Sequence, residues 1–168
     1  TKQFYKAFTT SGKGPYLRTE DMGFIHEGEL FLYARLRDLI ELQNKKYAPQ
    51  DIELAVQNAH EGIRKGNIAA FAVTIKNKNH LVIVAEKNDK VKAEHSDLYI
   101  AIVEAIALKF HLNIYEIVLV QPRSIHKTTS GKVQRQYAKK SYLTKKLRIV
   151  DSWLSPWTKR NSGIMQPL

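Results

Sequence analysis

A basic segment rich in hydroxyl residues, at positions 124–135, holds the side chains best suited to chemistry on an anion. Small hydroxyl residues and Gly131 lead up to Lys132, and a helix is expected to follow. Backbone N–H groups in such a turn can converge on an anion, and the lysine adds a mobile charge. A P-loop needs glycine five residues before the Gly-Lys pair and Ser or Thr after the pair. His126 and Val133 occupy those positions, which excludes a Walker-type NTPase.

The positive charge of the chain is concentrated around this segment. The formal charge is +11 at pH 7 over 168 residues, and nine lysines and arginines lie between residues 117 and 150 without a single acid. Those nine are Arg123, Lys127, Lys132, Arg135, Lys139, Lys140, Lys145, Lys146 and Arg148. Such local charge predicts an acidic ligand or binding partner, which could be a nucleic acid, a nucleotide or an acidic protein. Taken alone, the segment is also typical of a solvated basic surface.

Composition narrows the class of protein. The absence of cysteine removes disulfides, thiolate zinc sites and cysteine nucleophiles, and favours a cytoplasmic location. The six histidines show no HxxxH spacing, so we predict no metal site. No apolar run reaches the roughly 18 residues of a membrane span. The chain starts at Thr1 without a visible signal peptide, and we interpret it as a fragment of a longer protein.

The spacing of apolar residues predicts the elements that would position the basic segment. Strands are expected at residues 24–26, 29–33, 39–43, 68–76, 80–87 and 114–120. Three helices are expected: from Pro49 to Gly62 or Gly66, at 99–110 with Ser96 as N-cap, and from 134 to about 147. A loop is expected at 44–48, and the helix at 99–110 should be largely buried, with Leu108 on its apolar face. This order predicts an α+β domain with a short β-hairpin and a three-stranded sheet covered by helices. We expect Trp153 and Trp157 to pack the C-terminal tail onto that domain.

Four segments in a fixed order distinguish this chain from a generic basic domain. They are residues 16–24, 28–40, 49–53 and 127–135. In this order and at these separations they resemble the last conserved motifs of the acyl-adenylate-forming enzymes, which include acyl-CoA synthetases, luciferases and peptide-synthetase adenylation domains. The likeness is strongest to the fatty acyl-AMP ligases and long-chain acyl-CoA synthetases. It covers most of this chain, but only the C-terminal part of such an enzyme.

The resemblance implies roles for five residues. Asp21 matches the aspartate that accepts hydrogen bonds from the ribose hydroxyls of ATP, and Arg35 matches an arginine of the ribose and phosphate region. Arg37 and Asp38 fall at the hinge on which the small domain of the family pivots. Lys132 matches the lysine that bridges the attacking carboxylate, the ribose and the α-phosphate during adenylation.

The resemblance also implies a domain plan and a set of partners. Residues 1–35 would end the N-terminal adenylation domain, 36–39 would form the hinge, 40–150 the mobile C-terminal domain and 151–168 a tail. ATP and Mg²⁺ would be bound mainly by the missing N-terminal domain, and the fragment alone would be inactive. The substrate would be a fatty acid or another carboxylic acid. The acceptor would be the phosphopantetheine thiol of an acyl carrier protein, with no nucleic acid involved.

Two alternatives remain open at this point. A conventional acyl-CoA ligase would use CoA as the acceptor, and a non-enzymatic basic module would bind nucleic acid or an acidic protein. The chain also departs from the family pattern: Glu20, Ala34 and Asn44 replace glycines, and His126 replaces a common proline. Asn44 bears on thiol access, because the family turns the loop at residues 43–47 toward the active site after adenylation.

Overall fold

The computed structural model describes residues 6–7, 9–17 and 19–156. By its internal contacts the chain divides into two compact units, Thr1–Leu39 and Ile40–Leu168. The boundary between the units lies directly after residues 36–39, where the hinge is predicted. Rotation about this hinge stays a prediction. No helix among the described residues is long and apolar enough to cross a membrane.

The first unit consists of two small antiparallel hairpins and a 3₁₀ turn. β1 (Lys6–Ala7) pairs with β2 (Tyr16–Leu17), β3 (Asp21–His26) pairs with β4 (Glu29–Arg35), and the 3₁₀ helix η1 (Leu36–Asp38) follows. Glu27 and Gly28 form the turn between β3 and β4 with φ values of 49° and 83°. Two positive φ angles are the type I′ geometry, whose twist matches that of the flanking strands. The predicted hairpin is confirmed and extends by several residues on both strands.

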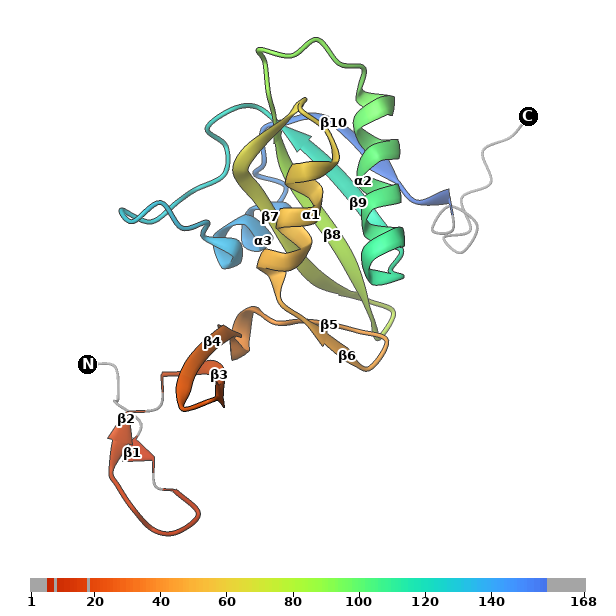
Figure 1. Cartoon of the computed structure of the whole chain (residues 1–168). Coiled ribbons are helices and arrows are strands. Elements are labelled where there is room, and N and C mark those ends of the chain that lie inside the picture. Colours follow the sequence, from red (N-terminus) through yellow and green to blue (C-terminus); the bar gives the residue numbers. More distant parts are fainter. Residues whose placement is uncertain (1–5, 8, 18, 157–168) are drawn as a thin grey trace. The chain divides into compact units, whose positions relative to one another are not determined.

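A four-stranded sheet forms the centre of the second unit, with strand order β10-β9-β8-β7 (Figure 1). β7 (Ile63–Ile75) and β8 (Lys78–Lys87) form an antiparallel hairpin, β9 (Ile114–Val120) lies parallel to β8, and β10 (Ile149–Leu154) is antiparallel to β9. Residues 81–86 of β8 and 117–120 of β9 are buried without interruption. Such continuous burial fits strands that are covered on both faces.

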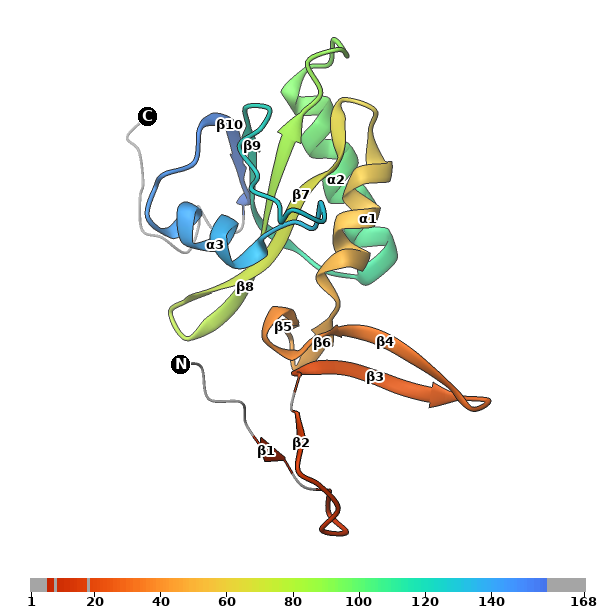
Figure 2. The ribbon, with the colours of Figure 1, turned by 90° about the vertical axis from the view of Figure 1, so that its left-hand side faces the viewer.

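Helices cover both faces of this sheet, as Figure 2 shows. α1 (Pro49–Ala59) and α2 (His95–Phe110) lie on one face, where they share a core with residues such as Ile83 and Ile117. α3 (Arg135–Leu143) lies on the other face and packs Ala138 and Tyr142 against Val84 and Val118. The α+β class is therefore confirmed, with one strand more than predicted.

The helices differ from prediction at their ends. α1 starts at Pro49, which occupies its first turn, but it stops at Ala59 rather than at Gly62 or Gly66. Gly62 serves packing instead, because a Cβ there would lie 2.8 Å from Cδ2 of Leu98 in α2. α2 starts at His95, with Glu94 rather than Ser96 as its N-cap residue, and Leu108 is 79% exposed. The expectation of a buried Leu108 was wrong, because α2 is covered on one side only.

The predicted loop at 44–48 contains a strand. β5 (Ile40–Leu42) and β6 (Lys45–Tyr47) form a hairpin whose two turn residues, Gln43 and Asn44, have φ values of 51° and 61°. No glycine marks this turn, so the hairpin could not be recognised from the local pattern of residues. Asparagine tolerates this left-handed conformation better than most residues do, so Asn44 keeps the backbone geometry that glycine would adopt.

The last strand, β10, was not predicted. It adds to the edge of the sheet, and its residues Ile149 and Val150 are exposed. Trp153 packs partly buried against the core beside α2, as expected for the tail, whereas Trp157 lies outside the described residues. Asp151 holds β10 to α2 through a hydrogen bond with His95 Nδ1 at 2.9 Å.

Candidate functional site

The predicted catalytic lysine lies at the tip of a short β-like loop, residues 126–134, here called the lysine loop. Lys127 and Val133 form an isolated antiparallel bridge, and Thr128 N donates to Lys132 O at 2.8 Å. Gly131 turns the chain with φ 80° and donates its N–H to Thr128 O at 2.9 Å. Residues 126–132 are all exposed. Lys132 is thus presented to the outside of its own unit.

Local hydroxyl groups hold the tip. Thr128 Oγ1 accepts the Lys132 N–H at 3.1 Å and lies 2.9 Å from Ser130 Oγ. The backbone N–H groups of Thr128, Gly131 and Lys132 therefore all donate within the loop. These three groups do not form the anion-binding turn considered for this sequence. The charge offered to an anion at the tip comes from the Lys132 ammonium group.

A carboxylate on α1 holds the C-terminal end of the lysine loop. Arg135 Nε donates to Glu53 Oε1 at 2.6 Å, and Arg135 Nη2 donates to Glu53 Oε2 at 2.7 Å. Both side chains are mostly buried, with 21% and 12% of their surface exposed. Glu53 Oε1 also accepts the backbone N–H of Ala70 in β7 at 3.1 Å. A bidentate pair of this kind fixes orientation as well as distance.

A second carboxylate holds the N-terminal end. The backbone N–H of Ile125 donates to Glu86 Oε1 at 2.9 Å, and Arg64 Nη1 donates to Glu86 Oε2 at 2.7 Å. Glu86 is fully buried in β8, and Ile125 is buried beside it. Each oxygen of Glu86 therefore has a partner, which is the condition under which a buried carboxylate remains tolerable.

The helix that follows the lysine loop is also tied to the sheet. The Tyr142 hydroxyl donates to Glu116 of β9, and burial, together with this hydrogen bond to a carboxylate, raises the pKa of Tyr142 above its ordinary value. Near the start of α3 the rings of His126 and Tyr137 lie 4.1 Å apart between centroids. The lysine loop therefore begins and ends on residues whose positions are set by the sheet and helices.

The two predicted nucleotide-binding residues of the first unit lie side by side. Asp21 and Arg35 are partners in the register of β3 and β4, and Arg35 Nε donates to Asp21 Oδ1 at 3.1 Å. The hairpin brings them together although 14 positions separate them in the sequence. A carboxylate has about four lone-pair sites on two oxygens, so Asp21 can accept ribose hydroxyls as well as the Arg35 bond.

The predicted hinge residues Arg37 and Asp38 lie in η1, which ends one residue before the boundary between the two units. Asp21 and Arg35 belong to the first unit and Lys132 to the second. Among the described residues there is no cluster of three or more side chains suited to hold a metal ion.

Sequence reasoning missed the four residues that anchor the lysine loop. They are Arg64, Glu86, Glu53 and Arg135, and neither pair is close in sequence: 82 positions separate Glu53 from Arg135. One signal was present, because Glu53 ends the motif at 49–53 and Arg135 ends the motif at 127–135. Two motifs that must meet in space are natural candidates for an ion pair.

Comparison with known families identifies the chain. A family described as "Disco-interacting protein 2-like, AMP domain" matches residues 37–152, which include the hinge positions, the sheet and the lysine loop. The chain belongs to this family. Its AMP domain matches acyl-adenylate-forming enzymes in both sequence and fold, so the resemblance seen in the four motifs is confirmed at the level of the superfamily.

Curated relatives of this Disco-interacting protein 2-like AMP domain include two ligases. One is the medium-chain-fatty-acid–[acyl-carrier-protein] ligase JamA of Moorena producens, 36% identical over 154 residues, which cover 90% of this chain and 26% of that protein. Another is the long-chain-fatty-acid–AMP ligase FadD23 of Mycobacterium tuberculosis, 36% identical over 132 residues, which cover 77% of this chain and 22% of that protein. The chain thus spans about a quarter of the length of these relatives.

Solved structures agree with the sequence comparisons. The fatty acid AMP ligase of Legionella pneumophila is 32% identical with a TM-score of 0.58, over 87% of this chain and 26% of that one. A structure from a study of fatty acyl-adenylate ligases of E. coli and L. pneumophila is 30% identical with a TM-score of 0.66, over 78% and 23% of the two chains. The structure of McyG A-PCP with phenylalanyl-adenylate matches with a TM-score of 0.68 at 23% identity, over 79% of this chain and 21% of that one, which supports the fold alone.

Proposed function

We propose that this AMP domain is the C-terminal part of an ATP-dependent fatty acyl-AMP ligase. The enzyme would activate a fatty acid as acyl-adenylate and pass the acyl group to the thiol of a carrier protein. One observation carries the proposal: the lysine of the family motif is held at an exposed tip whose two ends are clamped by mostly buried carboxylates. A cation placed in this way can be presented to a site outside its own unit.

The proposed role of Lys132 is electrostatic. A carboxylate oxygen of the fatty acid would form a bond to the α-phosphorus of ATP, the bond from that phosphorus to the bridging oxygen would break, and pyrophosphate would leave. Two anions must approach each other for this step, and an ammonium group between them offsets their repulsion. By analogy with other electrostatic donors, loss of Lys132 should lower the rate by about 10²–10³.

Asp21 and Arg35 would hold the nucleotide. Their mutual hydrogen bond orients a carboxylate for the two ribose hydroxyls and a guanidinium for the phosphate region. Mg²⁺, when bound with ATP, would neutralise part of the triphosphate charge. We assign none of its ligands to the described residues and propose that the preceding domain supplies most of the contacts to ATP and Mg²⁺.

The second half-reaction would follow a rotation about Arg37 and Asp38. Lys132 would leave, and the β5–β6 turn at Gln43 and Asn44 would approach the active site. The thiol sulfur would then attack the acyl carbonyl carbon, and AMP would leave. Because Asn44 has the left-handed backbone that glycine would adopt, only its side chain distinguishes this turn from the family pattern. The basic surface between residues 117 and 150 would attract an acidic carrier protein, in the cytoplasm.

The test of this proposal uses the full-length protein. Lys132→Ala should lower ATP–pyrophosphate exchange dependent on fatty acid by about 10²–10³. Lys127→Ala is the matched control, because it removes the same charge from the same exposed loop and should change the rate less than threefold, by analogy with exposed charges. Normal exchange by Lys132→Ala would refute the proposed mechanism.

Two further measurements address the finer parts of the proposal. Residues 1–168 alone should show no pyrophosphate exchange, and measurable exchange would contradict the need for a preceding domain. The full-length enzyme should transfer its acyl group to a carrier-protein thiol in preference to CoA. The alternative is an acyl-CoA ligase, which is favoured by a 37% identity to a protein named putative fatty-acid–CoA ligase fadD21 of Mycobacterium leprae. A preference for CoA would establish that alternative.

A further inference from the structure

A basic hollow lies at one end of the central sheet, away from the β5–β6 hairpin. β8 and β9 are parallel, so their carboxyl ends, at Lys87 and Val120, meet at this end (Figure 1). The antiparallel neighbours β7 and β10 begin there, at Ile63 and Ile149. Ligands of sheets with parallel strands commonly bind outside the carboxyl ends of those strands.

The hollow has a volume of about 840 Å³ and a strongly one-sided charge. Its cations are Arg64, Lys87, Lys90, Arg123 and Arg148, and its one acid is Asp89. Glu86 offsets Arg64, and Asp89 offsets one further charge, so three cations remain in excess. The excess of like charge on one concave surface attracts an anion, which would offset the repulsion among these cations.

A smaller hollow of about 220 Å³ shares two lining residues, Arg123 and Arg148, with the first. It adds Lys146 and two serines, Ser124 and Ser141, to the lining. The hydroxyl of Ser124 is buried and has no hydrogen-bond partner among the described residues. A buried hydroxyl without a partner is uncommon, because the missing hydrogen bond leaves its desolvation uncompensated. This oxygen has almost no solvent-accessible surface, so it lies behind the lining and makes no contact with an anion in the hollow.

The two shared arginines are held by the backbone around them. Arg123 has φ 63°, a left-handed conformation that is strained for a residue of this type. Arg148 Nη2 makes two long hydrogen bonds of 3.3 Å, to the carbonyl oxygens of Pro122 and Arg123. For Arg123, Arg148 and Lys146 no carboxylate lies within 4 Å among the described residues.

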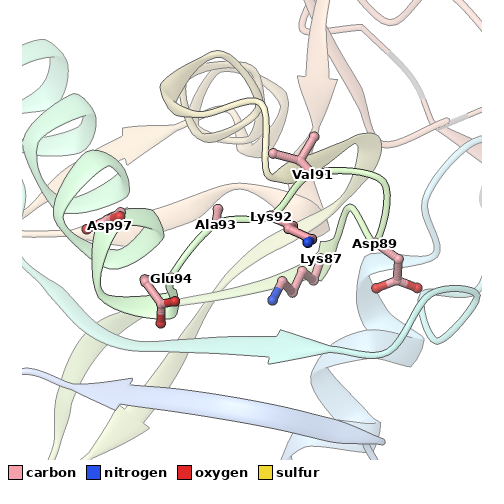
Figure 3. A pocket seen from close by; sticks show the side chains of 7 residues that line it. All are labelled: Lys87, Asp89, Val91, Lys92, Ala93, Glu94 and Asp97. Atoms are coloured by element: carbon pink, nitrogen blue, oxygen red, sulfur yellow. The ribbon is translucent and has the colours of Figure 1, made fainter.

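A neighbouring hollow has a different balance of acidic and basic side chains. It has a volume of about 520 Å³ and is drawn in Figure 3. Asp89 and Glu94 lie on opposite sides of Lys87 and Lys92 in that view, and Asp97 adds a third carboxylate. Acids outnumber bases there, although Lys87 and Asp89 line both hollows. The cations that distinguish the larger hollow are therefore Arg64, Lys90, Arg123 and Arg148.

We propose that the two hollows that share Arg123 and Arg148 bind a compact oligophosphate. The cations are spread over both hollows, so several phosphoryl groups in a row match them better than one carboxylate or one phosphate. Guanidinium groups suit phosphate oxygens because they donate two parallel hydrogen bonds. The larger hollow has no aromatic ring in its described lining, whereas His126 and Tyr137 line the smaller one. Aromatic rings can stack on bases, so a nucleic acid is the competing ligand that the test must exclude.

The test is titration of inorganic tripolyphosphate into the 168-residue chain, followed by calorimetry and amide NMR shifts. Arg123→Gly is the most informative variant, because glycine tolerates φ 63° and the change removes the guanidinium without adding strain. Arg123→Gly and Arg148→Gln should each weaken binding about tenfold, as expected for a lost charge-assisted hydrogen bond.

Two control variants separate this site from simple charge and from the proposed adenylation site. Lys140→Ala removes an exposed charge of α3 outside both hollows and should leave the affinity unchanged. Lys132→Ala should also leave it unchanged, so the proposal stands or falls independently of the ligase mechanism. A loss of affinity in Lys140→Ala equal to that in Arg123→Gly would show diffuse attraction and overturn the proposal.

The source of the phosphate chain is decided by competing ligands. Equal affinity for tripolyphosphate and ATP would support a site for free oligophosphate. Tighter binding of ATP, lost in Arg123→Gly, would support the same site with a nucleotide as its ligand. Binding of an RNA oligonucleotide without any binding of tripolyphosphate or ATP would refute the proposal.

Discussion

The two ends of the lysine loop and its tip are built from different interactions. At the ends, Glu53 and Glu86 are mostly or fully buried carboxylates, and each joins the loop to a strand or helix distant in sequence. At the tip, Thr128 and Ser130 form short-range bonds between exposed groups. Buried charge-assisted bonds resist opening more than exposed local ones do.

This difference has a mechanistic meaning for a lysine that must enter and leave an active site. Strong anchors at the ends place the tip reproducibly relative to the domain. A tip held by weak local bonds can adapt to the substrate at low energy. We therefore expect changes at the ends to act on global stability, and changes at the tip to act on local order.

The largest effect is expected for Glu53→Ala. This change removes the bidentate partner of Arg135 and the acceptor of the Ala70 N–H, and should lower the free energy of unfolding by about 3 kcal/mol. Urea unfolding of the 168-residue chain measures it. Glu104→Ala, at an exposed position of α2, is the control and should change stability by less than about 0.5 kcal/mol. Equal effects of the two changes would show that Glu53 does not anchor the lysine loop.

Glu86→Gln should have the next largest effect, about 2 kcal/mol. Glutamine keeps an acceptor for the Ile125 N–H but loses the ion pair with Arg64, whose side chain is 41% exposed and can regain water. A double-mutant cycle with Arg64→Met isolates the pair. A coupling energy near zero would mean that Glu86 acts through Ile125 alone.

Gly131→Ala should destabilise by about 1 kcal/mol or less. An added Cβ would meet no atom within 4 Å, so the cost comes from φ 80° alone. Gly131→Asn should recover part of the loss, since asparagine tolerates positive φ. Thermal unfolding of the wild type, Gly131→Ala and Gly131→Asn ranks their stabilities. A loss of stability in Gly131→Ala larger than that in Glu53→Ala would contradict the proposed difference between the ends and the tip.

Thr128→Val should have the smallest effect on global stability, roughly 0.5 kcal/mol or less. The change removes the acceptor of the Lys132 N–H, so exchange of that amide hydrogen should accelerate. The Ala70 amide, which donates to Glu53, is the internal reference and should keep its exchange rate. Unchanged exchange at Lys132 would show that the tip hydroxyls do not order the loop.

Most of the central fold could be read from local sequence patterns. The apolar runs of β7, β8 and β9 and the proline at the start of α1 each signal an element without reference to the rest of the chain. β10 could not be read in this way, because an exposed edge strand such as Ile149–Leu154 lacks a continuous apolar run. The β5–β6 hairpin was missed because Gln43 and Asn44 form its turn without glycine.

In the candidate site too, residues within short motifs could be predicted, and residues that depend on long-range contacts could not. Lys132, Asp21 and Arg35 could be named because each lies in a short motif, and the structure shows that Asp21 and Arg35 pair. Their roles in catalysis stay predictions. The anchors of the lysine loop depend on contacts between segments 22 and 82 positions apart, which no local pattern specifies.

The position of β10 has a practical consequence for anyone who shortens this protein. β10 is the last described strand in the chain, yet it pairs with β9 along one side of the sheet. Ending the polypeptide before Ile149 would leave the N–H and C=O groups on that side of β9 without partners. An exposed edge strand with unpaired backbone groups can pair with strands of other molecules, so such truncated versions should self-associate and precipitate.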